Sequence, residues 1–211
     1  NDLVSGQYKN TLMISVITNN AAGANATLVR GIHFNQNIIR AANLAGANIQ
    51  SIKGFTRSSV APSASMKTVN IEDGNESSYE IKAWYDPADQ AIHYYCENDR
   101  VYMNEDSRQM FNNIANIVNI DLSGLDSRYV KDMSFMFNNA RSVENLDLSN
   151  LNTSRVTSMM NMFAYMLSLK NLNISNLNTK KVKDFSRMFT SNAALTSLNL
   201  SNFDTSDAEN M

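Results

Sequence analysis

Apolar residues in the second half of the chain recur with a period of 26 residues. A Met-Phe pair sets the register, at 110–111, 136–137, 162–163 and 188–189. Four further columns are apolar in every copy: Ile117, Val143, Leu169 and Leu195; Ile120, Leu146, Leu172 and Leu198; Leu122, Leu148, Ile174 and Leu200; and Leu125, Leu151, Leu177 and Phe203. A fifth column is always serine: Ser123, Ser149, Ser175 and Ser201. Five columns without exception at one period indicate a true internal repeat.

Within one copy the hydrophobic period changes along the chain. Leu146 and Leu148 alternate with polar neighbours, which predicts a short, half-buried strand. The apolar residues that follow have the i, i+3, i+6, i+7 spacing of a helix: Val156, Met159, Met162 and Phe163. Thr153 or Ser154 precedes this stripe and is suited to cap its first amides. Each repeat is therefore predicted to contain a strand, a turn and a short helix.

Such a unit buries its apolar face only against other copies, with parallel strands about 4.8 Å apart. The predicted fold is α/β, a leucine-rich-repeat-like right-handed solenoid of parallel strands and short helices. The Met and Phe side chains are interpreted as core, although Met-rich surfaces also bind partners. Asparagines follow each predicted strand, where they can bond nearby backbone or the copy above: Asn150, Asn176 and Asn202.

No copy of the repeat precedes Ser107, so residues 1–105 are predicted to be an N-terminal α/β capping region and residues 106–211 the four repeats. The segment 8–18 is a strand candidate. The segment 27–34 is strand-like, and Gln36 to Leu44 is helix-like. The segment 49–59 alternates like a strand.

Two hairpins are predicted in the rest of the capping region. Asp73, Gly74 and Asn75 form a turn signal between two strand-like stretches. The strand around Trp84 is then expected to pair in a second hairpin built from 91–97 and 100–104.

Composition excludes several classes of protein. The net charge of −2 and the absence of a Lys/Arg run leave no footprint for nucleic acid or an acidic membrane. The chain has one cysteine, Cys96, so it has no internal disulfide framework. No run of 18 apolar residues is present, so no membrane span is predicted in this fragment.

No catalytic constellation, metal site or cofactor site is predicted. His33 and His93 lie in strand-like runs, and neither has a metal-ligating neighbour at a suitable spacing. Cys96 has no histidine partner in sequence. The acidic stretch 72–80 lacks the spacing of a known Ca²⁺ loop. The chain is therefore predicted not to be an enzyme.

The repeat resembles that of the BspA-like leucine-rich-repeat proteins, including the mycoplasma-type lipoprotein repeat. Their consensus is similar to LDLSNFDTSNVTNMSxMF, and Phe203-Asp204-Thr205-Ser206 after LNLSN is close to it. The resemblance extends upstream through 81–111, which includes the strand of Trp84. It implies a bacterial secreted or surface-attached protein of Gram-positive type, often an adhesin, without catalytic residues. Members commonly have Cys or Gly shortly after the Met-Phe pair, where this chain has Asn139, Tyr165 and Ser191.

The predicted binding surface is the outward face of the strands. Its residues are Asn119, Asp121, Ser123, Asn145, Asp147, Ser149, Asn171, Asn173, Ser175, Asn199 and Ser201. This face has no Trp, Tyr or Arg anchor, which suggests a weak, multivalent or cation-assisted binder of a protein or glycan on a host or neighbouring cell.

An alternative function is structural: a surface stalk, or an assembly subunit of a phage or other particle with no ligand of its own. Met211 falls within the apolar stripe of the last copy, in the column of Met133, Met159 and Phe185. The open edge there is expected to pair with further repeats or another subunit.

Overall fold

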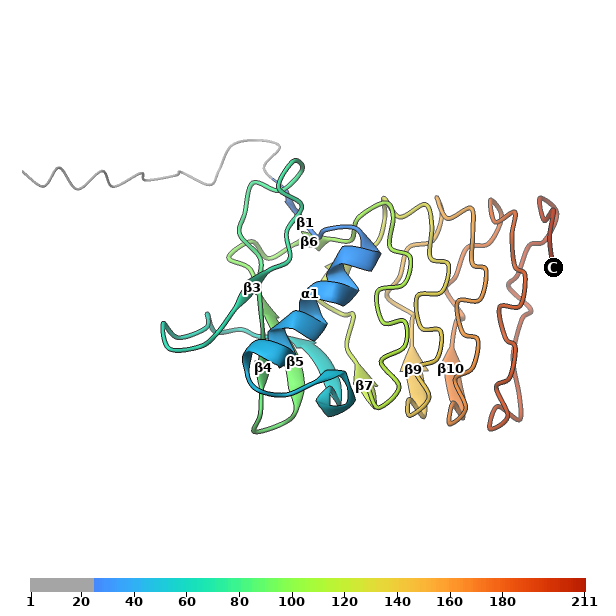
Figure 1. The fold of residues 1–211 in the computed structure, drawn as a ribbon. Coiled ribbons are helices and arrows are strands. Elements are labelled where there is room, and N and C mark those ends of the chain that lie inside the picture. The colour runs from blue at the N-terminus through green and yellow to red at the C-terminus, as the bar shows by residue number, and fades with distance from the viewer. Residues whose placement is uncertain (1–24) are drawn as a thin grey trace, which may run out of the picture.

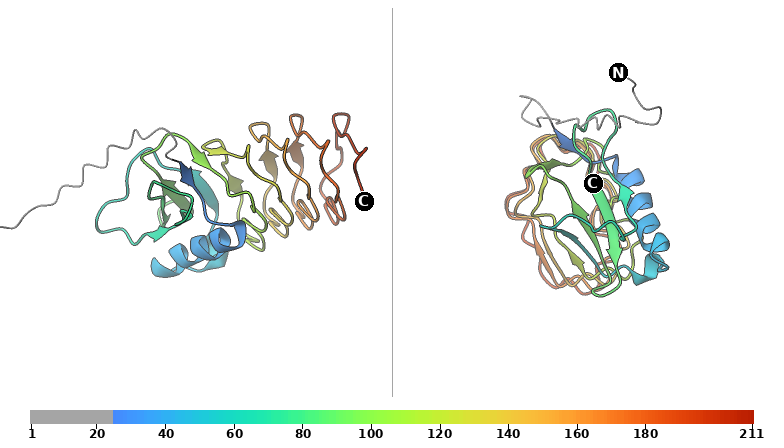
Figure 2. Two further views of the ribbon diagram at one scale, coloured as in Figure 1. Left: turned by 90° about the horizontal axis from the view of Figure 1, so that it is seen from above. Right: turned by 90° about the vertical axis from the view of Figure 1, so that its left-hand side faces the viewer.

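The computed structural model describes residues 25–211, which form a mixed α/β structure of small sheets with one α-helix in the described part (Figure 1). The strand predicted over 8–18 lies outside the described residues. Helix α1 and strands β1 to β6 occupy one end, and the repeats follow as successive loops of chain laid side by side, with α1 on one side of the first part (Figure 2).

The first part of the chain supplies one helix, one 3-10 turn and six strands. They are β1 (Ala26–Thr27), α1 (Gly31–Leu44), η1 (Ile49–Ser51), β2 (Gly54–Arg57), β3 (Val69–Asn70), β4 (Lys82–Asp86), β5 (Ala91–Tyr95) and β6 (Val101–Tyr102). The repeats add β7 (Asn119–Ile120), β8 (Leu125–Asp126), β9 (Asn145–Asp147) and β10 (Asn171–Asn173).

Three sheets connect these strands. The largest has the order β3-β4-β5-β2-β7, with antiparallel pairing from β3 to β5 and parallel pairing from β5 to β7. A second sheet, β1-β6-β8, is parallel throughout, and β9 pairs with β10 in a third. Two sheets therefore join strands of the first hundred residues to strands of the first repeat.

Helix α1 begins earlier than the sequence suggested. The strand-like interpretation of 27–34 is wrong beyond β1, because Phe34, Ile38 and Ala41 already share the buried face of the helix. Gly31 starts the helix where a Cβ atom would collide with the backbone of Arg108. The close approach of α1 to the first repeat thus depends on a glycine.

The first predicted hairpin is confirmed as an antiparallel pair, β3 with β4, and β4 also pairs with β5. The expected pairing of β6 in the second hairpin is wrong. Strand β6 lies in the other sheet, between β1 and β8. The loop before β6 leads the chain from one sheet to the other, and Arg57 donates a hydrogen bond to the carbonyl oxygen of Asn98 in that loop.

The repeats contain no α-helix in the described chain, so the short helices expected there are wrong. The amides of Met133, Phe135, Phe137 and Asn139 donate to carbonyl oxygens of the next copy, those of Ser158, Met160, Met162 and Ala164. The copies before and after repeat this pattern. Phe135 and Asn139 have φ of 57° and 62°, which no right-handed helix contains. The backbone bonds that a helix would close internally are made between copies.

The apolar stripe nevertheless faces inward, as expected for core residues. Met133, Met136 and Phe137 are fully buried. The phenylalanine of the Met-Phe pair stacks on its counterpart in the next copy, with centroids 5.8 Å apart for Phe111 and Phe137 and 5.9 Å for Phe137 and Phe163. Phe111 also meets Phe55 of β2 at 5.2 Å, so the core is continuous from the sheet into the repeats.

The predicted row of parallel strands forms only in part. Strands β9 and β10 pair in register, Leu146 with Leu172, whereas β7 pairs with β2 and the fourth copy forms no strand at 197–199. The first copy is held toward the capping region because both β7 and β8 hydrogen-bond there, to β2 and β6. No helix in residues 25–211 has the length and apolar character needed to cross a membrane.

Candidate functional site: a polar groove over the repeat strands

A shallow groove of about 820 Å³ runs over β7, β9 and β10. It brings together most of the residues predicted for the strand face: Asn119, Asp121, Ser123, Asn145, Asp147, Ser149, Asn171, Asn173 and Asn199. Ser175 and Ser201 do not line it. Lys170, Asn150 and Ser197 also line the groove. Lys170 could not be predicted from the repeat pattern, because it precedes the strand and belongs to no repeat column.

Polar side chains on the groove floor bond to one another across copies. The Asn171 Nδ2 atom donates to Asn145 Oδ1 at 2.7 Å, and Asn173 Nδ2 donates to Asp147 Oδ1 at 2.9 Å. At the rim, Lys170 Nζ lies 2.9 Å from Glu144 Oε2. The floor is therefore an ordered ladder, and each amide retains further donor or acceptor capacity.

The Asp and Asn residues of one groove column also fix the turn after each strand. Each side chain accepts the backbone amide hydrogen of the serine two residues later, which places the invariant serine column in a turn. The pairs are Asp121 with Ser123, Asp147 with Ser149, Asn173 with Ser175, and Asn199 with Ser201. One side-chain oxygen in each copy is thus committed to structure.

Two carboxylates make the groove acidic. Hydrogen bonds from the backbone and hydroxyl of Ser149 lower the pKa of Asp147. For Asp121, partial burial acts to raise the pKa, but hydrogen bonds from Ser123 and Thr56 outweigh it and the pKa is lowered. Both groups are therefore ionised at neutral pH.

The predicted role of the asparagines after the strands is confirmed. Asn150 Nδ2 donates to the Leu122 carbonyl oxygen of the preceding copy at 2.9 Å, and Asn176 Nδ2 donates to that of Ser149 at 2.8 Å. The first copy has Gly124 at this position. A Cβ there would collide with the Tyr94 hydroxyl and with the side chain of Arg57. The capping region fills the space that asparagine occupies in later copies.

The outward sheet face continues beyond the groove toward the capping region. Phe55, Ile92 and Ile120 point into the core, so their neighbours Thr56, His93 and Asp121 point outward in one row across β5, β2 and β7. The Thr56 hydroxyl donates to Asp121 Oδ2 at 3.2 Å.

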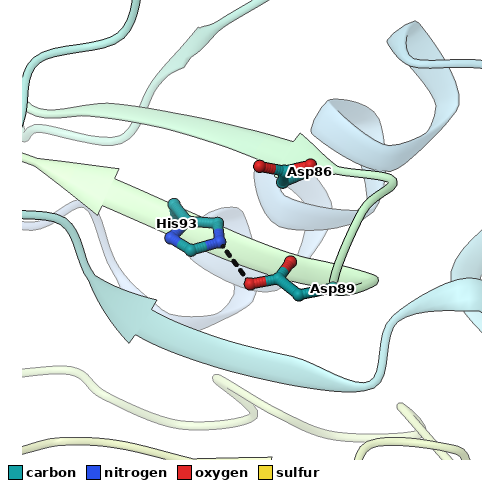
Figure 3. A group of neighbouring side chains, drawn as sticks. All are labelled: Asp86, Asp89 and His93. Atoms are coloured by element: carbon teal, nitrogen blue, oxygen red, sulfur yellow. Dashed lines mark hydrogen bonds and ion pairs between the residues drawn. The ribbon is translucent and has the colours of Figure 1, made fainter.

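His93 has ligand-type neighbours that the sequence spacing did not reveal (Figure 3). Its Nε2 atom lies 2.9 Å from Asp89 Oδ2, and one carboxylate oxygen each of Asp86 and Asp89 lies within 4.8 Å of the imidazole nitrogen and of the other. The expectation that His93 has no such neighbour is wrong, because the β4–β5 turn folds residues seven and four positions earlier back against it. The i, i+4 spacing of Asp89 and His93 across a turn was the available signal.

The other chemistry-bearing residues have structural surroundings. His33 is exposed on α1, and Cys96 is buried, with a pKa raised by burial. In the acidic stretch, Asp73 Oδ1 accepts the Asn75 amide hydrogen and Oδ2 accepts from Asn104. Those bonds fix the local turn.

The structure defines the class of protein: a repeat protein whose 26-residue copies are joined by backbone hydrogen bonds from one copy to the next. Residues 105–211 match the family described as "Mycoplasma protein of unknown function, DUF285". The match covers just over half of the chain, and the protein belongs to this bacterial family, which is related to the BspA-like repeat proteins. Comparison with curated proteins and with solved structures found no match.

Proposed function

We propose that this chain is a non-enzymatic binding module that holds a protein segment or a glycan along the groove over β7, β9 and β10. The observation that carries the proposal is the regular polar floor of that groove, in which successive copies present Asn145 and Asn171, then Asp147 and Asn173. Equivalent groups repeated from copy to copy suit an extended ligand that is itself repetitive or strand-like.

We further propose that the repeats form a right-handed leucine-rich-repeat-like solenoid of the BspA-like kind. Support comes from the parallel bridges that link equivalent positions of successive copies: Asp106, Asp132, Ser158, Asp184 and Asn210. A parallel chain path that returns to the same position each time is right-handed in nearly all proteins. A secreted or cell-surface location is part of the same proposal, and it rests on the resemblance to surface proteins.

The binding proposal is tested with peptide and glycan arrays, followed by affinity measurements on each hit. The informative variant is Asn145→Ala with Asn171→Ala, which removes an exposed ladder pair from the groove floor. The matched control is Lys180→Ala with Lys181→Ala, two exposed residues of the same copy as Asn171 that do not line the groove. We expect at least tenfold weaker binding for the groove variant and none of that loss for the control. Absence of any hit, or equal effects of both variants, counts against the groove.

A second candidate is an assembly role, favoured by one observation. The face of the fourth copy carries an apolar depression lined by Phe185, Phe189, Leu200, Phe203 and Met211, and Leu200 and Met211 are 41% and 82% exposed. We propose that another repeat, from the same protein or another subunit, covers this face. Light scattering over a range of concentrations tests the subunit version, and Leu200→Lys should then shift the mass toward the monomer.

A further inference from the structure

The β4–β5 hairpin brings a histidine and two aspartates together on the outward sheet face, away from the groove (Figure 3). Asp86 ends β4, Asp89 lies in the turn and His93 lies within β5. One ligand atom of each lies within 4.8 Å of the others. Around an ion with ligand bonds of about 2.0–2.2 Å, such atoms stand about 3–4 Å apart, so a small side-chain movement closes the set.

Each of the two carboxylates accepts a backbone hydrogen bond through one of its oxygens. Asp86 Oδ1 accepts the Ala88 amide hydrogen at 2.8 Å, and Asp89 Oδ1 accepts that of Ala91 at 3.0 Å. The second oxygen of Asp86 can therefore bind another partner, while that of Asp89 already faces His93 Nε2. Orientation of a ligand group by a backbone hydrogen bond is the usual support of a metal site.

The imidazole is held by packing. The His93 ring stacks on the indole of Trp84 with centroids 5.6 Å apart and an interplanar angle of 17°. Trp84 is its direct partner in the antiparallel ladder. The His93 side chain is 19% exposed and that of Asp89 is 54% exposed, so the ring is partly desolvated while the set stays open to solvent. An ion can reach the set without opening the fold.

We propose that Asp86, Asp89 and His93 bind one divalent transition-metal ion of the zinc type. One imidazole nitrogen with two carboxylate oxygens is a mixed set that suits Zn²⁺, Ni²⁺ or Cu²⁺, whereas Mg²⁺ and Ca²⁺ prefer oxygen ligands alone. Before binding, the hydrogen bond to the Asp89 carboxylate requires a proton on His93 Nε2. On binding, the imidazole gives up that proton to water, carries its proton on Nδ1 and turns its Nε2 lone pair to the ion. The ion then takes the place of the hydrogen bond between His93 and Asp89, and water completes its coordination.

The chain offers its own reporter for this site, because Trp84 is its only tryptophan. Zn²⁺ alone is titrated into the full chain by calorimetry, and Cu²⁺, which quenches nearby indoles, is titrated while Trp84 fluorescence is recorded. We expect one Zn²⁺ ion to bind per chain. Quenching by Cu²⁺ should saturate at the same ratio of metal to protein. Failure to detect binding of one Zn²⁺ ion per chain would overturn the proposal.

Variants separate this site from chance binding. His93→Phe keeps a ring against Trp84 but removes the nitrogen, and Asp86→Asn removes a charge with little change of shape. Each should weaken Zn²⁺ binding at least tenfold, while His33→Gln, at the other histidine of the chain, should leave it unchanged. Circular dichroism of each variant shows that the fold is retained. Zn²⁺ affinity that survives His93→Phe, or is lost with His33→Gln, contradicts the assignment, as does tighter binding of Ca²⁺ than of Zn²⁺ at this site.

Discussion

The hydroxyl group of Thr153 forms two hydrogen bonds with the backbone of Asn178 in the next copy. Its Oγ1 atom donates to the Asn178 carbonyl oxygen at 2.9 Å and accepts from the Asn178 amide at 2.8 Å. Ser127 makes the same pair of bonds with Asn152, and Thr179 makes it with Asp204. These three hydroxyl groups are almost completely buried, so each satisfies a donor and an acceptor that water does not reach.

Thr153→Val should destabilise the protein by about 1–3 kcal/mol, because a methyl group of the same size leaves both backbone groups of Asn178 unpaired. Thr153→Ser keeps the hydroxyl and should recover most of this loss. Thr205 occupies the same column in the last copy but is exposed, so Thr205→Val should change stability by less than about 0.5 kcal/mol. Urea unfolding measures all three. Equal losses for Thr153→Val and Thr205→Val would contradict the inter-copy role.

Gly124→Asn restores the residue found at this position in the other copies, yet it should destabilise the protein by about 1–3 kcal/mol. The new side chain must displace the Tyr94 hydroxyl and Arg57, which already fill its space. The reverse change, Asn150→Gly, removes only the hydrogen bond to Leu122 and should cost about 0.5–1.5 kcal/mol. Thermal unfolding compares the two, and a stabilising Gly124→Asn would refute the packing argument.

Tyr165→Gly should stabilise the protein by about 1 kcal/mol. Tyr165 has φ of 59° and is 46% exposed, so its side chain adds little packing while the left-handed backbone disfavours any Cβ atom. Glycine removes that strain. Leu167→Gly is the matched control, at a residue with similar exposure and no positive φ, and it should be destabilising. Denaturant midpoints of the two variants should move in opposite directions.

The ion pair of Asp106 with Arg108 should make stability depend on acid pH. The Arg108 hydrogen bond lowers the pKa of Asp106 below its ordinary value of 3.8, so the folded state favours the ionised carboxylate. That contribution is complete above about pH 4 and is lost as pH falls through the lowered pKa. Asp106→Asn should flatten the fall of unfolding free energy between about pH 5 and about pH 3.

Arg108→Gln removes the partner and should flatten the same part of the curve, because its guanidinium lies 2.8 Å from Asp106 Oδ2. The double variant should then differ little from either single one. Additive effects of the two changes on the acid slope would show that the pair does not act as a unit.

Sequence patterning predicted the inward and outward residues of the repeats well, and the secondary structure between the strands badly. The spacing of Val156, Met159, Met162 and Phe163 matched a helix, but the same residues reach the core from an extended, turning backbone. Hydrophobic spacing records which side chains are buried. It does not record whether a backbone amide bonds within its own copy or with the next one, because both satisfy the amide equally well.

The sequence by itself determined the 26-residue period, the buried columns and the polar strand face, because a repeated environment selects the same kind of residue in every copy. Only the tertiary structure decided what happens where different segments meet. The first copy pairs with β2 and β6, and the Tyr94 hydroxyl occupies the space beside Gly124 that a side chain would need. The β4–β5 turn places Asp86 and Asp89 beside His93. Such contacts join residues whose sequence spacing follows no period, so they arise from three-dimensional packing and the repeat pattern does not record them.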